Sequence, residues 1–336
     1  MATVQERSVI KGTYAYHILN KIAEGGMGTV YEVEQRGTEG FVKRMALKAI
    51  TSHHATNAEF VSMFIGEARL VAQLVHPNIV QIYHLDRTEG GQLFLAMEYI
   101  DGINLEQFLI RHIEQKCQIP LDIATFIVAR VARGLEFAHQ KRDQYSDQPL
   151  HLVHRDISPK NIMITSEGEV KLTDFGIAKA LNYLHQDEER VLMGGEYMSP
   201  EQAAFQVTDA RSDLFSLGVV YLELLTCRND YLGEDIGLTL NRIKRAVLPE
   251  PRRYRPEIPE DMERILLRAL QREPKARYAS AGEMVYDLEY YIYHRGYGPT
   301  ITSLARYAAE LFPERHFYVP PQPKTTIIYN RSPRFS

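Results

Sequence analysis

The stretch that decides the fold is LVHRDISPKNIMI, residues 152–164. It places Asp156, Lys160 and Asn161 in one short loop before a predicted strand, and VKLTDFG then adds Asp174 after a second strand. Phosphoryl transfer from a nucleotide needs oxygen ligands for metal ions, a carboxylate that orients the attacking hydroxyl, and a cation on the transferred phosphate. These side chains supply those groups at a specific spacing, so we expect them to form one site.

The N-terminal part predicts a small antiparallel sheet. Apolar and polar residues alternate over residues 14–50 around a glycine-rich break, AEGGMGTV, which indicates three strands. The break joins two strands, whereas dinucleotide-binding and Walker loops run from a strand into a helix. We therefore expect a glycine flap over phosphates, with a plain hairpin turn as the alternative. Two further apolar runs, IVQIYHL and LFLAMEYI, predict another hairpin.

Two charged residues occupy positions where apolar residues are expected. Lys48 ends RMALK on the third predicted strand, facing inward, and Glu67 lies in the apolar stripe of a helix predicted over NAEFVSMFIGEARLVAQLV. A buried cation and a buried carboxylate each require a partner. We predict that Lys48 and Glu67 pair in a cleft; two separate surface charges are the alternative.

After Gly102 the sequence changes from strand-rich to helix-rich. Six segments with amphipathic or buried-helix patterns follow, and one more short helix lies beyond Gly296. The predicted class is α+β, with two lobes: a small antiparallel sheet with one helix, then a larger helical lobe. The predicted divisions are an N-terminal extension at 1–13, lobes at 14–99 and 103–295 of one domain at 14–295, and a C-terminal helix with a proline-containing basic tail at 296–336.

Composition limits the possible functions. The chain has 336 residues, 45% of them hydrophobic, which is enough for a substantial core. A net charge of -4 argues against nucleic-acid binding through bulk electrostatics. The two cysteines, Cys117 and Cys227, have no CxxC spacing and indicate neither a disulfide framework nor a structural zinc site. No apolar run reaches the length of a membrane span, and we expect a cytoplasmic protein.

The complete set of motifs resembles the eukaryotic-like (Hanks-type) serine/threonine protein kinases of bacteria. The spelling of HRDISPKN and YMSPEQ is similar to that of deltaproteobacterial, myxobacterial members. The resemblance implies a bilobal protein kinase-like fold, ATP and Mg²⁺ (with Mn²⁺ possible) as cofactors, and a protein substrate with a serine or threonine acceptor. The matching elements are AEGGMGTV, MALK, Glu67, HRDISPKN, DFG, SPE and SDLFSLG.

The resemblance also assigns roles to the residues of the predicted site. Asp156 would be the catalytic base, with Lys160 and Lys48 as catalytic cations and Glu67 as the tether of Lys48. Met97 would be the gatekeeper of the adenine slot. The metal ligands would be Asn161 and Asp174. The residues that would bind ATP are Ile22, Ala23, Glu24, Gly25, Gly26, Gly28, Val30, Ala46, Lys48, Met97, Met163 and, at the hinge, Glu98 and Tyr99.

Other charged and apolar residues resemble the scaffold of this family. Glu201 and Arg277 correspond to a buried ion pair beneath the substrate platform, and Asp213 to a carboxylate that holds the catalytic loop. The residues that match a stack of side chains aligning the two lobes are His154, Phe175, Val71 and Ile82.

The chain departs from the family pattern in three places. Ala23 replaces the first glycine of the loop, and Gly194 replaces a threonine that contacts the catalytic residues. Between Asp174 and Met198 there is no serine or threonine, only Tyr183 and Tyr197, and Tyr183 is the alternative site for regulatory phosphorylation. The acidic run Asp187, Glu188 and Glu189 could replace an activating phosphate, with a solvated acidic loop as the alternative.

The sequence is compatible with three functional hypotheses. The first is an active serine/threonine kinase, and the second is a pseudokinase that binds nucleotide and acts through protein contacts. The third, a small-molecule phosphotransferase, is disfavoured by SPE and Arg277, which the resemblance assigns to a protein-substrate platform. A regulatory protein partner or a dimer is compatible with either of the first two.

Overall fold

The structure is a computed structural model that describes residues 9–25, 28–51, 57–143, 146–175 and 195–320. Within these ranges, no helix combines the length and the apolar character that crossing a bilayer requires.

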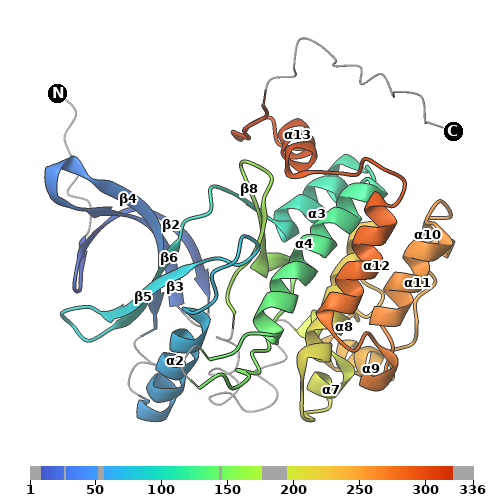
Figure 1. The fold of residues 1–336 in the computed structure, drawn as a ribbon, viewed down its shortest axis with the longest axis horizontal. Helices are drawn as coiled ribbons and strands as arrows, with labels where there is room; N and C mark the ends of the chain where they lie inside the picture. The colour runs from blue at the N-terminus through green and yellow to red at the C-terminus, as the bar shows by residue number, and fades with distance from the viewer. Residues whose placement is uncertain (1–8, 26–27, 52–56, 144–145, 176–194, 321–336) are drawn as a thin grey trace, which may run out of the picture.

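The N-terminal lobe is a curled antiparallel sheet of six strands, seen on the left of Figure 1. Its spatial order is β1-β2-β3-β4-β6-β5. The predicted strands and hairpin are all present, and β1 adds a short strand from within the predicted N-terminal extension. The strands are β1 (Val9–Lys11), β2 (Ala15–Gly25), β3 (Gly28–Arg36), β4 (Val42–Ile50), β5 (Ile82–Arg87) and β6 (Leu93–Glu98).

One helix, α2 (Ala58–Val71), accompanies this sheet, as predicted. The Asn57 side chain accepts hydrogen bonds from the first free amides, those of Glu59 and Phe60, which explains where the helix begins. After this helix the chain contacts the second lobe: the backbone amide of Val80 donates a hydrogen bond to the backbone carbonyl of Leu172 at 2.9 Å. This bond joins the lobes next to the predicted site.

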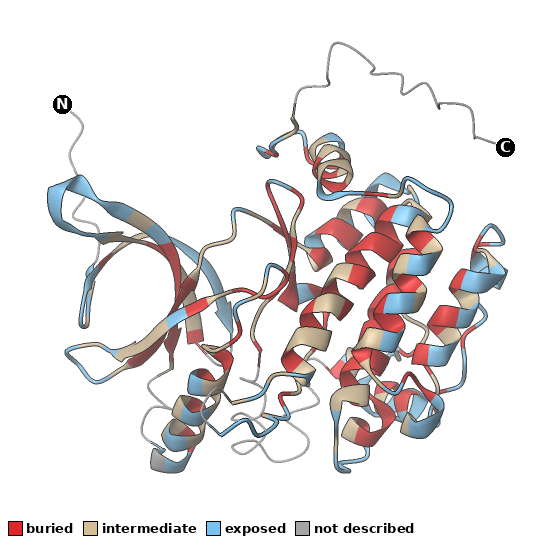
Figure 2. Ribbon diagram, viewed as in Figure 1, coloured by how far each residue is buried: buried red, intermediate tan, exposed pale blue. Residues whose placement is uncertain are grey.

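The C-terminal lobe is helical, which confirms the predicted α+β class with a smaller sheet lobe followed by a larger helical lobe (Figure 1). Its long central helices are buried along the faces that meet, as the red segments of α4 and α8 show in Figure 2. The helices are α3 (Leu105–Gln115), α4 (Leu121–His139), α7 (Pro200–Ala203), α8 (Ala210–Thr226), α9 (Ile236–Arg245), α10 (Pro251–Tyr254), α11 (Glu260–Ala269), α12 (Ala281–Tyr293) and α13 (Ile301–Leu311).

One continuous apolar core connects the two lobes. It runs from Ile50 and Phe64 in the first lobe to Leu135 and Leu222 in the second, and all four side chains are buried. A separate, smaller cluster around Tyr16 covers the other face of the N-terminal sheet. The continuous core fixes the position of the lobes relative to each other on the side where the predicted site lies.

A second, three-stranded sheet presents that site. It has the order β7-β8-β9, built from β7 (Gly102–Asn104), β8 (Ile162–Thr165) and β9 (Val170–Leu172). The loop with Asp156 enters β8, and Asp174 follows β9 after one residue. The sheet therefore brings together the two motifs from which the fold was predicted.

Candidate active site

Asp156 and Asn161 form the centre of the site. Asn161 uses both amide hydrogens on Asp156, donating to the backbone carbonyl at 2.8 Å and to the carboxylate Oδ2 at 2.9 Å. Burial raises the pKa of Asp156, and the negative charge of Asp174 acts in the same direction, whereas the charge of Lys48 acts against it. The predicted catalytic carboxylate is thus buried, held by Asn161 and close to two further charged residues of the site.

The loop that carries Asp156 is anchored by hydrogen bonds to the carboxylate of Asp213, as predicted. The two carboxylate oxygens of Asp213 accept the backbone amides of His154 and Arg155 at 2.8 and 2.7 Å. Burial alone raises the pKa of Asp213, but the hydrogen bond from His139, the electrostatic effects of His139 and His154 and the backbone amide of Arg155 outweigh it, and the net pKa is lowered. A charged Asp213 therefore anchors a loop in which Arg155 has a left-handed backbone, with φ of 66°.

The predicted partner of Lys48 is wrong in this structure. Lys48 is buried on β4, and its Nζ lies 2.7 Å from Oδ1 of Asp174, so the ion pair described for it is with Asp174 and not with Glu67. A buried cation requires a carboxylate partner, and Asp174, whose backbone has φ of 60°, supplies it here. Glu67 is half-buried on α2.

Lys160 lies at the edge of the site. Its Nζ is 3.5 Å from Oε1 of Glu106 in the first turn of α3, and its side chain is 71% exposed. An exposed pair of this kind is weak, because solvent screens it. Lys160 lies four residues after Asp156 in the sequence. Its side chain is long and exposed to solvent, and it would have to extend toward a phosphate to place its charge there.

The predicted adenine slot is assembled from both lobes. Ala46 and Met97 are buried and face each other as partners across β4 and β6, and Val30 pairs with Ala23 across β3 and β2. Half-buried Met163 comes from β8 in the other lobe. The remaining predicted lining residue, Ile22, and the loop residue Glu24 are exposed on β2.

The predicted hinge is held by a residue that the sequence analysis missed. The backbone amide of Glu98 already donates to the carbonyl of Gln81 at 2.8 Å, so Glu98 can offer a ligand only its carbonyl. Lys171 on β9 contacts the Glu98 carboxylate at 2.9 Å, and the Arg44 guanidinium lies 4.2 Å from the ring centre of Tyr99. Lys171 gave no signal in the sequence because its strand has only three residues.

The glycines of the predicted flap differ in whether the surrounding structure leaves room for a side chain. A Cβ added at Gly28 would lie 2.0 Å from the carbonyl oxygen of Ala49, so the packing of β3 on β4 already demands glycine there. A Cβ added at Gly25 would meet nothing within 4 Å. Packing therefore explains Gly28, whereas Gly25 borders open space where a ligand could approach. The predicted Gly26 lies outside the described residues.

Asn161 and Asp174 fit a small divalent cation. Because both hydrogens of the Asn161 amide bind Asp156, its Oδ1 is the atom that can ligate a metal. Together with the Asp174 carboxylate this gives hard oxygen donors, and Mg²⁺ is commonly held by one or two such groups plus substrate phosphates. Among the residues that the structure describes, no cluster of three or more His, Cys, Asp or Glu side chains could hold a metal by itself.

The predicted scaffold contacts are present. Arg277 pairs with Glu201 through two nearly parallel contacts of 2.7 and 2.8 Å, and both side chains are buried. The ring of His154 lies edge-on to that of Phe175, with 4.6 Å between centres. The other two members of the predicted stack, Val71 and Ile82, are buried in the same core cluster.

The features predicted for the segment between the site and the platform are not described by the structure. Residues 176–194 include Tyr183, Gly194 and the acidic run at Asp187, Glu188 and Glu189, all of which lie outside the described residues. The substitute-phosphate hypothesis therefore stays a prediction.

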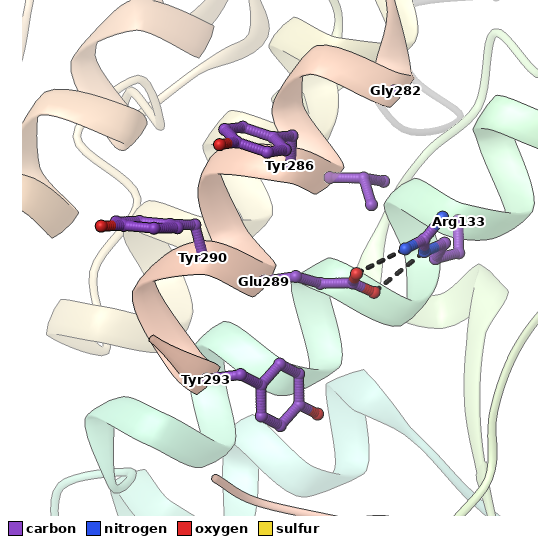
Figure 3. Close-up of a pocket in the computed structure, with 7 residues that line it drawn as sticks. Arg133, Gly282, Tyr286, Glu289, Tyr290 and Tyr293 are labelled. Carbon is purple, nitrogen blue, oxygen red and sulfur yellow. Dashed lines mark hydrogen bonds and ion pairs between the residues drawn. The ribbon is translucent and has the colours of Figure 1, made fainter. Parts of the chain in front are cut away.

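A hollow of about 460 Å³ lies away from these residues, between α4 and α12. Figure 3 shows Arg133 of α4 joined to Glu289 of α12, while Tyr286 and Tyr290 extend from the outer face of α12. The hollow contains none of the predicted site residues, and its ion pair joins two scaffold helices.

Comparison with known proteins agrees with this geometry. The protein kinase domain model matches residues 16–287. The tyrosine-protein kinase MasK of Myxococcus xanthus is 38% identical over 303 residues, which cover 90% of this chain and 47% of the relative. The serine/threonine-protein kinase PrkC of Bacillus subtilis is 34% identical, over 82% of this chain and 40% of the relative.

The chain thus spans less than half the length of these two curated relatives. Among solved structures, the PknI kinase domain of Mycobacterium tuberculosis superposes with a TM-score of 0.63 and 26% identity, covering 86% of this chain and 99% of that chain. The resemblance to bacterial and specifically myxobacterial kinases, predicted from the motif spelling, is confirmed. The chain belongs to the protein kinase domain family.

Proposed function

We propose that this chain transfers the γ-phosphoryl group of ATP, with Mg²⁺ or Mn²⁺, to serine or threonine hydroxyls of protein substrates. The observation that carries the proposal is the convergence of two pairs, Lys48 with Asp174 at 2.7 Å and Asn161 with Asp156 at 2.8 and 2.9 Å, with the charges of Lys48 and Asp174 both acting on the pKa of Asp156. A cytoplasmic location and a regulatory partner or dimer are part of the same proposal.

The residues divide the chemistry among them. Asp156 accepts a hydrogen bond from the attacking hydroxyl and takes its proton, and Asn161 fixes the carboxylate for this task. Lys48 is buried at the inner end of the site, where its Nζ can move from Asp174 to phosphate oxygens. Asp174 and the Oδ1 of Asn161 would hold a divalent metal ion, which would neutralise the charge on the phosphates.

The acceptor class rests on two arguments. Lys160 follows Asp156 in DISPKN, a spelling typical of kinases that act on serine or threonine, whereas tyrosine kinases of this family usually carry arginine and alanine there. Several relatives are named serine/threonine kinases, among them PrkC and the PknA protein of Mycobacterium tuberculosis. MasK is named a tyrosine-protein kinase, which makes tyrosine the rival acceptor.

The direct test is transfer of label from γ-labelled ATP to a generic basic protein in the presence of Mg²⁺. We expect the chain to label the protein and the Lys48→Met variant to lose at least about a hundredfold in rate, because the buried cation on the phosphates is gone. Equal labelling by the chain and by Lys48→Met would refute the proposal and favour a nucleotide-binding module without catalysis.

The two glycines of the flap should separate binding from stability. We expect Gly25→Ala to raise the KM for ATP roughly threefold or more, because the methyl group occupies space beside the phosphates, with unfolding unchanged. We expect Gly28→Ala to lower the free energy of unfolding by about 1–3 kcal/mol, because its Cβ collides with Ala49. ATP kinetics and urea denaturation of both variants check this. A Gly25→Ala variant with normal KM would place the phosphates elsewhere.

A further inference from the structure

The chain continues past residue 287, where the family match ends, and this extra part packs against the C-terminal lobe. Helix α13 buries Leu304, Ala308 and Leu311 in the main core. The Tyr307 hydroxyl lies 2.6 Å from Nε2 of His112, whose Nδ1 lies 2.7 Å from the Phe108 carbonyl. Residues 300–318, which we call the C-terminal clamp, are therefore an integral part of this lobe.

His112 is a buried residue of α3 that contacts the C-terminal clamp directly. Its side chain is fully buried, and burial lowers its pKa, which favours the neutral ring. With its Nδ1 hydrogen on the Phe108 carbonyl, Nε2 accepts the Tyr307 hydroxyl hydrogen. Arg111 adds a second link, because its guanidinium lies 4.5 Å from the ring centre of Phe312 and pairs with Glu314.

The clamp also holds the sheet that carries the site. Arg315 Nη1 donates to the carbonyl of Gly102 at 3.0 Å, and the amide of Tyr318 donates to the carbonyl of Ser166 at 2.8 Å. Gly102 pairs with Thr165 at the end of the β7–β8 ladder, and the Ser166 amide donates to the Asp101 carbonyl at 2.7 Å. Both bonds from the clamp therefore act on the same end of two paired strands.

The turn between β8 and β9 is shaped for this contact. Gly168 has φ of 86°, and a Cβ there would lie 2.0 Å from the carbonyl oxygen of Ile301 at the start of α13. Figure 1 shows the tip of the β8 hairpin beside α13. The backbones of the turn and of the clamp are in direct contact, which only glycine permits.

From these contacts we propose that Arg315 is a positioning residue for ATP binding, through its hold on the Gly102 carbonyl. The proposal rests on the proposed function. Gly102 lies three residues after hinge residue Tyr99, and β8, paired with β7, carries Met163 opposite Asn104. Strands of three and four residues form only a short ladder, so contacts from outside the ladder help to fix the outer end of this sheet. Arg315 fixes its outer end, and with it the floor of the adenine slot.

The effect of the Arg315 charge on Tyr99 also places Arg315 close to the predicted hinge. Burial raises the pKa of the Tyr99 phenol, and the positive charge of Arg315 is one of those that oppose the rise. Arg315 is therefore near the hinge side chain as well as bonded to the strand that follows it, although it lies 216 positions later in the chain.

The test measures nucleotide affinity apart from turnover in the full chain. With a fluorescent, non-hydrolysable ATP analogue and Mg²⁺, we expect Arg315→Ala to bind about fivefold more weakly, the equivalent of one lost hydrogen bond. The KM for ATP should rise by the same factor, with kcat and the urea midpoint unchanged because the side chain is exposed. Arg315→Lys should recover part of the affinity.

Arg264→Ala is the matched control, since Arg264 is an exposed arginine on α11 paired with Asp261 at 2.8 Å. It should bind the analogue as the unaltered chain does. If Arg315→Ala also binds normally, the clamp proposal is overturned while phosphoryl transfer stands. If the unaltered chain binds the analogue but transfers no phosphate, only the proposed function fails. If it does not bind nucleotide, both are overturned.

Discussion

Replacement of Asp156 by asparagine is expected to lower kcat by about 10²–10⁴-fold while ATP binding stays within a factor of about three. The reason is local. Asn161 donates to Oδ2 of Asp156 at 2.9 Å, and the carboxamide oxygen of asparagine can accept the same bond in the same shape. The variant therefore keeps the loop and loses only the ability to take a proton. Steady-state transfer and titration with the ATP analogue measure the two quantities.

Asp147→Asn is the control for this change, because Asp147 lies on the surface with a side chain that is 84% exposed. It should transfer phosphate at the normal rate. A kcat for Asp156→Asn within tenfold of the unaltered chain would show that Asp156 is not the catalytic base.

Replacement of Glu201 by alanine is expected to lower the free energy of unfolding by about 3–5 kcal/mol, because the change leaves the buried Arg277 charge unpaired. The exposed fraction of the Arg277 side chain is 0%, so water cannot replace the lost carboxylate. Ser212 also loses the oxygen to which its hydroxyl donates at 2.6 Å. The midpoint of urea denaturation measures this loss.

Two further variants make the test specific. Arg277→Ala should cost at least as much, because it strands Glu201 and three backbone carbonyls, including that of Gln271 at 2.7 Å. Asp261→Ala, which breaks the exposed pair with Arg264, should cost less than about 1 kcal/mol. A loss below about 1 kcal/mol for Glu201→Ala would mean that the pair does not secure the platform.

The parts of the site that were predictable are those encoded in short stretches. Asp156 and Asn161 are five residues apart in one loop, so their contact follows from local chain geometry. The strands of the N-terminal sheet show clear alternation, and the helices of the second lobe show helical spacing, because one face of each is buried. The Glu201–Arg277 and Asp213 contacts were not local. They were predicted only through the resemblance to a family.

The contacts that the sequence did not predict are those between residues that become neighbours only in the folded chain. The sequence offers Lys48 two carboxylates, and only the folded chain shows that Asp174 is the one in contact. Glycine at 25 and at 28 looks alike in sequence, yet only Gly28 is constrained by a neighbouring strand. The contact of Arg315 with Gly102 joins residues too distant for any periodic pattern to reveal.

The proposed phosphoryl transfer to serine or threonine is decided by the identity of the phosphorylated amino acid after transfer from γ-labelled ATP. A protein substrate that contains serine, threonine and tyrosine is labelled by the chain, hydrolysed and separated into phosphoamino acids, beside Asp156→Asn as the inactive control. We expect label on serine or threonine, dependent on Asp156. Label confined to tyrosine, or the same label with Asp156→Asn, would contradict the proposal.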